Sequence, residues 1–231
     1  MLFDVIRSLA YGYHVDVWQI VAQVVSIVFV ILCILPLHEF AHGWVANKLG
    51  DPTAKLAGRL TLNPLASVDP VGTVALILFG FGWAKPVPVD SRYFKKPRRD
   101  VALTALAGPV SNLLAALVGA FFVTLLIAFA PSNGVTQFLL NMLYYYVVVN
   151  ISLAVFNLIP LPPLDGSRIV GAFLSSRALY TYYRYQNIFV MVMFVLLLSG
   201  AMAGPLSTVQ NFFARIIFAL AEAPFRLFGA L

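Results

Sequence analysis

The sequence predicts an all-α integral membrane protein: a bundle of about 4–6 transmembrane helices with a short re-entrant or β-hairpin segment between the first and second long spans. Of its 231 residues, 61% are hydrophobic and only 10% are charged, and the mean hydropathy is +0.90. A soluble globular domain carries far more charge. Long stretches such as residues 101–164 contain no charged side chain and no histidine, and basic residues cluster between such stretches.

The net charge of +6 is carried mainly by loops that flank the apolar runs. This distribution follows the positive-inside rule and indicates no nucleic-acid partner. The lipid bilayer is therefore the predicted partner of the surface. The single cysteine, Cys33, excludes an intrachain disulfide. We expect one polytopic domain over residues 1–231, with a core at 17–170 and a further span and amphipathic helix within 187–231.

The first predicted span covers residues 17–47 and contains no Asp, Glu, Lys, Arg or His before His38. Pro36 predicts a kink just ahead of that histidine, because proline removes a helical hydrogen bond. Gly50 predicts the stop of this helix after Leu49.

Residues 51–100 are the predicted re-entrant or β-hairpin region. The apolar stretch 71–83 is shorter than the roughly 20 residues that cross a bilayer, so we expect it to re-enter or to pack against the bundle. Pro86 and Pro88 alternate with valines, which predicts an extended segment. Such a segment is a plausible edge strand for pairing with an unwound peptide.

Three later spans are predicted at residues 101–130, 136–159 and 187–203. Residues 206–231 predict an interfacial amphipathic helix, because Arg215, Glu222 and Arg226 interrupt their apolar pattern. The loops 48–100 and 165–186 are basic, which places them in the cytoplasm and the uncharged turn 131–136 outside. The compact chain, without a recognisable targeting segment, favours a prokaryotic plasma (inner) membrane.

The stretch His38-Glu39-Phe40-Ala41-His42 predicts a metal site. Histidines four residues apart project from one face of a helix, where their imidazoles can share a metal ion. A catalytic zinc site needs a third protein ligand and keeps one position open. Asp165 is the candidate, since it is the first charged side chain after Asp100. Charged groups at membrane depth are costly unless they are paired or bind metal.

This ligand set predicts one Zn²⁺ per chain and a hydrolytic reaction. Zinc lowers the pKa of a bound water to about 7 and polarises a carbonyl group. Glu39 lies next to the first ligand, so it is the predicted general base. We expect peptide hydrolysis at a cytoplasmic-side active site, because no glycine-rich phosphate loop is present.

Three motifs in order resemble those of the site-2 protease family of intramembrane zinc metalloproteases. They are H38-E-F-A-H42, G108-P-V-S-N112 and N157-L-I-P-L-P-P-L-D165-G166, and the stretch G80-F-G-W-A-K-P-V-P-V89 is also similar. The resemblance covers roughly residues 30–170. It implies zinc ligation by His38, His42 and Asp165, catalysis by Glu39, and a transmembrane-helix protein as substrate. The compact form, without a PDZ or CBS module, leaves substrate selection and any regulatory membrane partner open.

Asn112 and Asn157 are amides in otherwise apolar helices. Each is a candidate for hydrogen bonding to the substrate backbone or to a developing oxyanion. The alternative is that they tie helices together, as membrane asparagines often do.

Two other functions fit parts of the sequence. A non-proteolytic zinc-binding scaffold or transporter component would use the ligands alone, but Glu39 between the histidines argues against it. A membrane zincin of the CAAX-processing kind would use a downstream glutamate, for which only Glu222 is available. Asp165 is therefore the discriminating residue.

Overall fold

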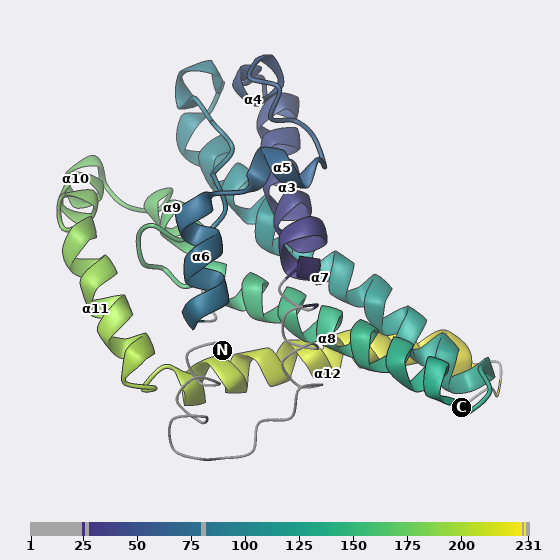
Figure 1. Ribbon diagram of the computed structural model, residues 1–231. Coiled ribbons are helices and arrows are strands. Elements are labelled where there is room, and N and C mark those ends of the chain that lie inside the picture. The colour runs from purple at the N-terminus through teal and green to yellow at the C-terminus, as the bar shows by residue number, and fades with distance from the viewer. Residues whose placement is uncertain (1–24, 26–27, 80–81, 228, 230–231) are drawn as a thin grey trace.

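A computed structural model describes residues 25, 28–79, 82–227 and 229, and this part of the chain is helical with no β-strand (Figure 1). Its elements, in order, are a π-helical turn Val30–Ile34, α3 (Leu35–Lys48), α4 (Thr53–Leu56), α5 (Pro64–Ser67), α6 (Pro70–Phe79), a 3-10 turn Ser91–Tyr93, α7 (Pro97–Phe129), α8 (Gly134–Asn157), α9 (Asp165–Gly171), α10 (Ser176–Arg184), α11 (Gln186–Leu198) and α12 (Ala203–Leu227).

Two helices, α7 and α8, are long and apolar enough to cross a membrane, so the segments predicted at 101–130 and 136–159 are helices and candidate spans. The α10 and α11 helices meet at a bend of 57° and count as a third candidate only when they are taken together. Ten of the 31 residues of the predicted first span, 17–24 and 26–27, lie outside the described residues. The total of about 4–6 spans therefore stays a prediction.

The described end of the first span agrees with the proline and glycine signals. Pro36 stands in the first turn of α3, directly after the π-helical turn. The missing N–H of proline disturbs the ladder of hydrogen bonds at that point. The α3 helix ends at Lys48, and Gly50 follows with a φ of +110°. Glycine adopts this left-handed region without the steric cost that other residues have.

The α7, α8 and α12 helices form the apolar core of the bundle (Figure 1). Ala116 and Ala120 of α7 pack against Val147 and Ile151 of α8, and Ile217 of α12 joins the same cluster. Small residues on α7 permit close approach of the helices, which is the usual basis of packing in membranes. The predicted helix after residue 206 is thus confirmed as a helix, and it lies along both candidate spans.

The α3 helix packs against the first half of α7, and the short α9 helix packs against the same helix. The chain therefore brings α3 and α9, which are far apart in sequence, to one part of α7. This arrangement places the two histidines of α3 near the start of α9.

The predicted β-hairpin is not confirmed in the described residues. The apolar stretch forms α6, whose ten residues reach about 15 Å, half the thickness of the hydrocarbon core. Residues 84–90, which we call the 84–90 segment, are extended without strand pairing. The backbone of Lys85 is held at both polar groups: its N–H donates to Ser67 O at the end of α5 (2.9 Å), and its carbonyl accepts from Arg59 Nη2 (2.7 Å).

Asp51 holds the other end of this segment. Its side chain is fully buried and accepts hydrogen bonds from Asp90 N–H (2.7 Å) and Thr53 N–H (2.9 Å). A buried carboxylate with several donors fixes the loop, because removing it leaves those donors unsatisfied.

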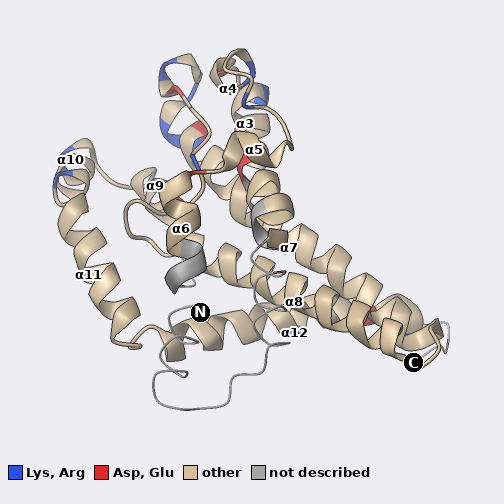
Figure 2. Cartoon of the chain, viewed as in Figure 1, with Lys and Arg blue, Asp and Glu red and all other residues tan. Residues whose placement is uncertain are grey.

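Most of the basic residues lie around α4, the start of α7 and α10 (Figure 2), whereas Arg215 and Arg226 lie on α12. This pattern agrees with the loops expected on one side of the membrane.

Replacing Asp51 by alanine should loosen the 84–90 segment. The backbone N–H groups of Asp90 and Thr53 then lose their acceptor, which lowers the free energy of local opening by about 2–4 kcal/mol. Trypsin should then cut after Arg92 or Lys95 at least tenfold faster, as followed by mass spectrometry. The control is Asp90→Asn, which loses only the exposed ion pair to Arg92. Equal cleavage rates in wild type and Asp51→Ala would refute this role.

Candidate metal centre

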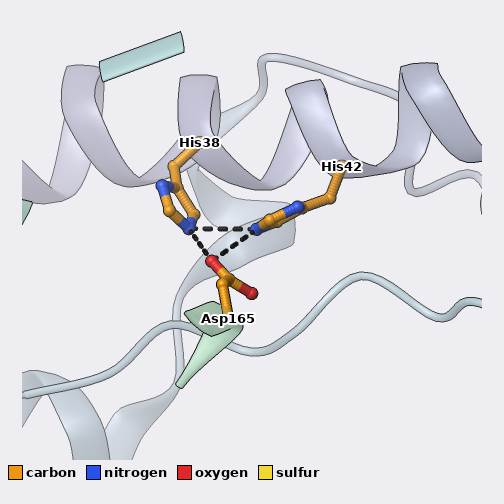
Figure 3. Close-up of side chains that lie close together, drawn as sticks. All are labelled: His38, His42 and Asp165. Atoms are coloured by element: carbon orange, nitrogen blue, oxygen red, sulfur yellow. Dashed lines mark hydrogen bonds and ion pairs between the residues drawn. The ribbon is translucent and has the colours of Figure 1, made fainter. Parts of the chain in front are cut away.

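His38, His42 and Asp165 converge on one point inside the bundle (Figure 3). His38 Nε2 lies 3.0 Å from His42 Nε2 and 3.2 Å from Asp165 Oδ2, and His42 Nε2 lies 3.1 Å from the same oxygen. The three residues expose only 6%, 7% and 9% of their surfaces. The structure thus brings together the three residues predicted as ligands.

The outer nitrogens of both imidazoles face acceptors. His38 Nδ1–H donates to Asn112 Oδ1 at 3.3 Å, and His42 Nδ1–H donates to the Thr104 carbonyl at 2.7 Å. These bonds fix the tautomer in which Nδ1 carries the proton and Nε2 has a free lone pair. The sequence gave no signal for Thr104, because its contribution is a backbone carbonyl.

With these tautomers, three lone-pair donors face one another at 3.0–3.2 Å with no proton between them. Such a cluster is repulsive by itself and is stabilised by a cation at its centre. Tetrahedral zinc with ligand bonds of about 2.0–2.1 Å places its ligand atoms about 3.3 Å apart. The residues present therefore fit a zinc ion with three protein ligands.

Gly108 of α7 lies against the metal site. A Cβ at this position would overlap His42 Nε2 and would lie 2.6 Å from His38 Nε2. Any larger residue would therefore occupy the space where the ligands meet. The absence of a side chain at Gly108 therefore lets the two histidines of α3 lie directly against α7.

Asp165 is carried to the site by the loop between α8 and α9. The Pro162–Pro163 bond in this loop is cis, and Asp165 begins α9. A Cβ on Gly166 would overlap the carbonyl oxygens of Leu158 and Ile159, so only glycine permits this close return of the chain.

Glu39 faces the 84–90 segment. Its Oε2 accepts the Val87 N–H at 2.8 Å. Val87 is itself buried, and its side chain lies close to Gly43, one turn further along α3. The extended segment therefore lies across the face of α3 that carries the predicted base. The functional contact of Val87 is a backbone donor, which the sequence pattern did not indicate.

The two asparagines differ in their surroundings. Asn112 is fully buried beside His38, and its Nδ2 has no hydrogen-bond partner among the described residues. Asn157 donates to Leu153 O of its own helix at 2.9 Å and is not part of the ligand cluster. A role for either in substrate binding stays a prediction. Glu222 pairs with Arg226 in α12 and is also outside the cluster.

A family model described as "Peptidase family M50" matches residues 26–200. The chain belongs to Peptidase family M50. The resemblance to site-2 proteases is thereby confirmed, and the M50 chain is a zinc metalloprotease.

Curated relatives of this M50 chain also carry names that describe zinc metalloproteases. "Putative zinc metalloprotease YwhC" of Bacillus subtilis is 47% identical over 150 residues, which cover 62% of this chain and 67% of the relative. "Putative zinc metalloprotease Rip2" of Mycobacterium tuberculosis is 31% identical over 201 residues, covering 83% and 71%. "Zinc metalloprotease MJ0392" of Methanocaldococcus jannaschii is 29% identical over 164 residues, covering 71% and 38%. No solved structure matches.

Replacing Asn112 by leucine should weaken zinc binding about 10–100-fold, because His38 loses the acceptor that fixes its tautomer. Asn112→Asp should keep most of the affinity, since it keeps an acceptor. The measurement is competition for zinc with a chromophoric chelator. Asn150→Leu is the matched control, because Asn150 is equally buried but donates only to Tyr146 O of its own helix. An equal loss of affinity in both leucine variants would show a general packing defect instead.

Proposed function

We propose that this M50 chain is a zinc-dependent intramembrane endopeptidase that hydrolyses peptide bonds in or near the transmembrane helices of membrane-protein substrates. The observation that carries the proposal is the convergence of three candidate ligand atoms beside helices long and apolar enough to cross a membrane. Glu39, next to one of the ligands and not itself part of the triangle, supports catalysis over simple metal storage.

In the proposed reaction, different residues bind the metal, transfer the proton and hydrogen-bond the substrate. His38, His42 and Asp165 hold the metal, one ion per chain. Zinc supplies the Lewis acid that polarises the scissile carbonyl and makes water nucleophilic at neutral pH. Glu39 accepts the proton of the attacking water and passes it to the leaving amine. The unpaired Nδ2 of buried Asn112 offers a donor for the developing oxyanion, and Asn157 remains a candidate for the substrate backbone.

A transmembrane substrate must unwind before its amide can be attacked, because helical hydrogen bonds shield it. The 84–90 segment offers an extended backbone with which an unwound substrate could pair, but one of its two edges has few N–H donors. In an extended chain Pro86 and Pro88 face one edge, and neither has an N–H. Lys85 and Val87 donate on the other edge, where Val87 N–H is bound to Glu39. Substrate pairing at this edge therefore frees the Glu39 carboxylate for catalysis.

The location follows from the basic end of the molecule. Along α3, His42 and His38 lie about 9 and 15 Å from Lys48, where the basic loops begin. We propose a prokaryotic plasma membrane with this end in the cytoplasm, as the positive-inside rule requires. The active site then lies within the bilayer, toward its cytoplasmic side.

The first test combines zinc content with cleavage of a model transmembrane peptide. Wild type should bind one zinc and cleave the peptide. Asp165→Ala should lose both, whereas Glu39→Gln should keep zinc and lose at least about 10²-fold in kcat. Glu222→Gln is the matched control, because it makes the same change at the only other glutamate. Metal and activity retained in Asp165→Ala would overturn the ligand assignment.

The orientation can be tested separately by cysteine labelling in intact cells. On a Cys33→Ser background, Ser132→Cys should react with a membrane-impermeant maleimide from outside. Lys95→Cys should react only after the cells are permeabilised. The reverse pattern would place the basic end, and with it the active site, on the outer side.

A further inference from the structure

A groove at the junction of α10 and α11 lies outside the catalytic machinery. Its volume is about 560 Å³. The two helices meet there at a bend of 57°, with the amphipathic, basic α10 followed by the uniformly apolar α11. A short basic helix that turns into an apolar one is typical of a chain passing from the bilayer surface into its core. The residues that line the groove include Ser175, Arg177, Thr181, Tyr182, Tyr185 and Phe189.

The groove is polar on the α10 side and apolar on the α11 side. Arg177 and the Ser175 hydroxyl belong to the α10 side, where the hydroxyl accepts only the Ala178 N–H and keeps its own hydrogen free. Phe189 belongs to the α11 side. On α11 itself, Ile188 and Val192 expose 53% and 45% of their surfaces. Donors therefore lie at one end of the groove, and apolar surface continues from the other.

The charged residues around the groove are all positive. Residues 166–221 contain four arginines and no Asp or Glu. In the described part of the chain, Arg177 is exposed and forms no ion pair. A second cation is close, since Arg98 of α7 donates to Leu174 O (3.2 Å) and Ser176 Oγ (2.7 Å). An anion is therefore the favoured occupant at the polar end.

The groove is also tied to the rest of the fold. Tyr182 O–H donates to Pro160 O at 2.6 Å, in the loop that carries Asp165. Tyr182 and Tyr185 are amphipathic rings of the kind enriched at headgroup level. One wall of the groove is thus fixed to the loop that carries Asp165, and it presents two tyrosines of the kind found at headgroup level.

We propose that this groove binds one anionic phospholipid from the leaflet around the basic end. The phosphate lies between the Arg177 guanidinium and the Ser175 hydroxyl, and an acyl chain follows Phe189 and the exposed face of α11. Arginine suits this task because its planar fork of N–H donors matches phosphate oxygens. The site is independent of the zinc ligands and of the proposed protease activity.

The test uses the full-length, zinc-loaded protein in nanodiscs or detergent, with phosphatidylglycerol and phosphatidylcholine as probes. Binding is measured by native mass spectrometry, or by titration with a labelled lipid at about 0.5 M salt, where delocalised surface attraction is largely screened. Wild type should retain one phosphatidylglycerol and bind phosphatidylcholine more weakly. Arg177→Gln should weaken phosphatidylglycerol binding about tenfold, and Arg177→Lys, which keeps the charge but not the fork, should weaken it less.

Arg184→Gln is the matched control, because Arg184 lies on the same helix, stacks on Tyr185 and does not line the groove. It should change the affinity less than about threefold at this salt concentration. Zinc content and elution volume should be unchanged in all variants. Equal losses in Arg177→Gln and Arg184→Gln, or equal binding of both lipids by wild type, would overturn the proposal. Binding of glycerol phosphate as tight as that of the lipid would show a phosphate site without a lipid component.

Discussion

The repulsion among three lone-pair donors is the constraint on which the rest of this structure depends. His38, His42 and Asp165 meet within 3.2 Å of one another, and the acceptors beside both imidazoles keep the protons on the outer nitrogens. Buried groups of this kind are unfavourable unless a cation neutralises them. The fold must therefore hold them in place rigidly, and the metal must supply the compensating charge.

The α7 helix provides most of that rigidity. It contributes the Asn112 side chain and the Thr104 carbonyl to the two imidazoles, and Gly108 gives the space that the ligands need. The same helix continues into the apolar core with α8 and α12. One helix therefore carries both the apolar core and the hydrogen-bond partners of the two imidazoles.

The contact between Val87 N–H and Glu39 links the metal site to the 84–90 segment. Asp51 and the preceding loop hold this segment in place, so the carboxylate is oriented by a part of the chain distant in sequence. In the proposed reaction, a substrate strand would compete with Glu39 for the Val87 N–H. Such competition would couple substrate binding to the availability of the proposed base.

The sequence by itself determined the membrane class, the two long apolar helices, the end of α3 just before Gly50 and the three candidate ligands, because hydropathy, glycine signals and ligand spacing are local or compositional properties. Only the tertiary structure decided which groups orient the ligands, what Glu39 contacts, and that residues 70–79 form a short helix while the 84–90 segment stays unpaired. Backbone carbonyls and N–H groups such as those of Thr104 and Val87 have the same chemistry at every position. Their roles depend on which segments pack together, and no side-chain pattern encodes that choice locally.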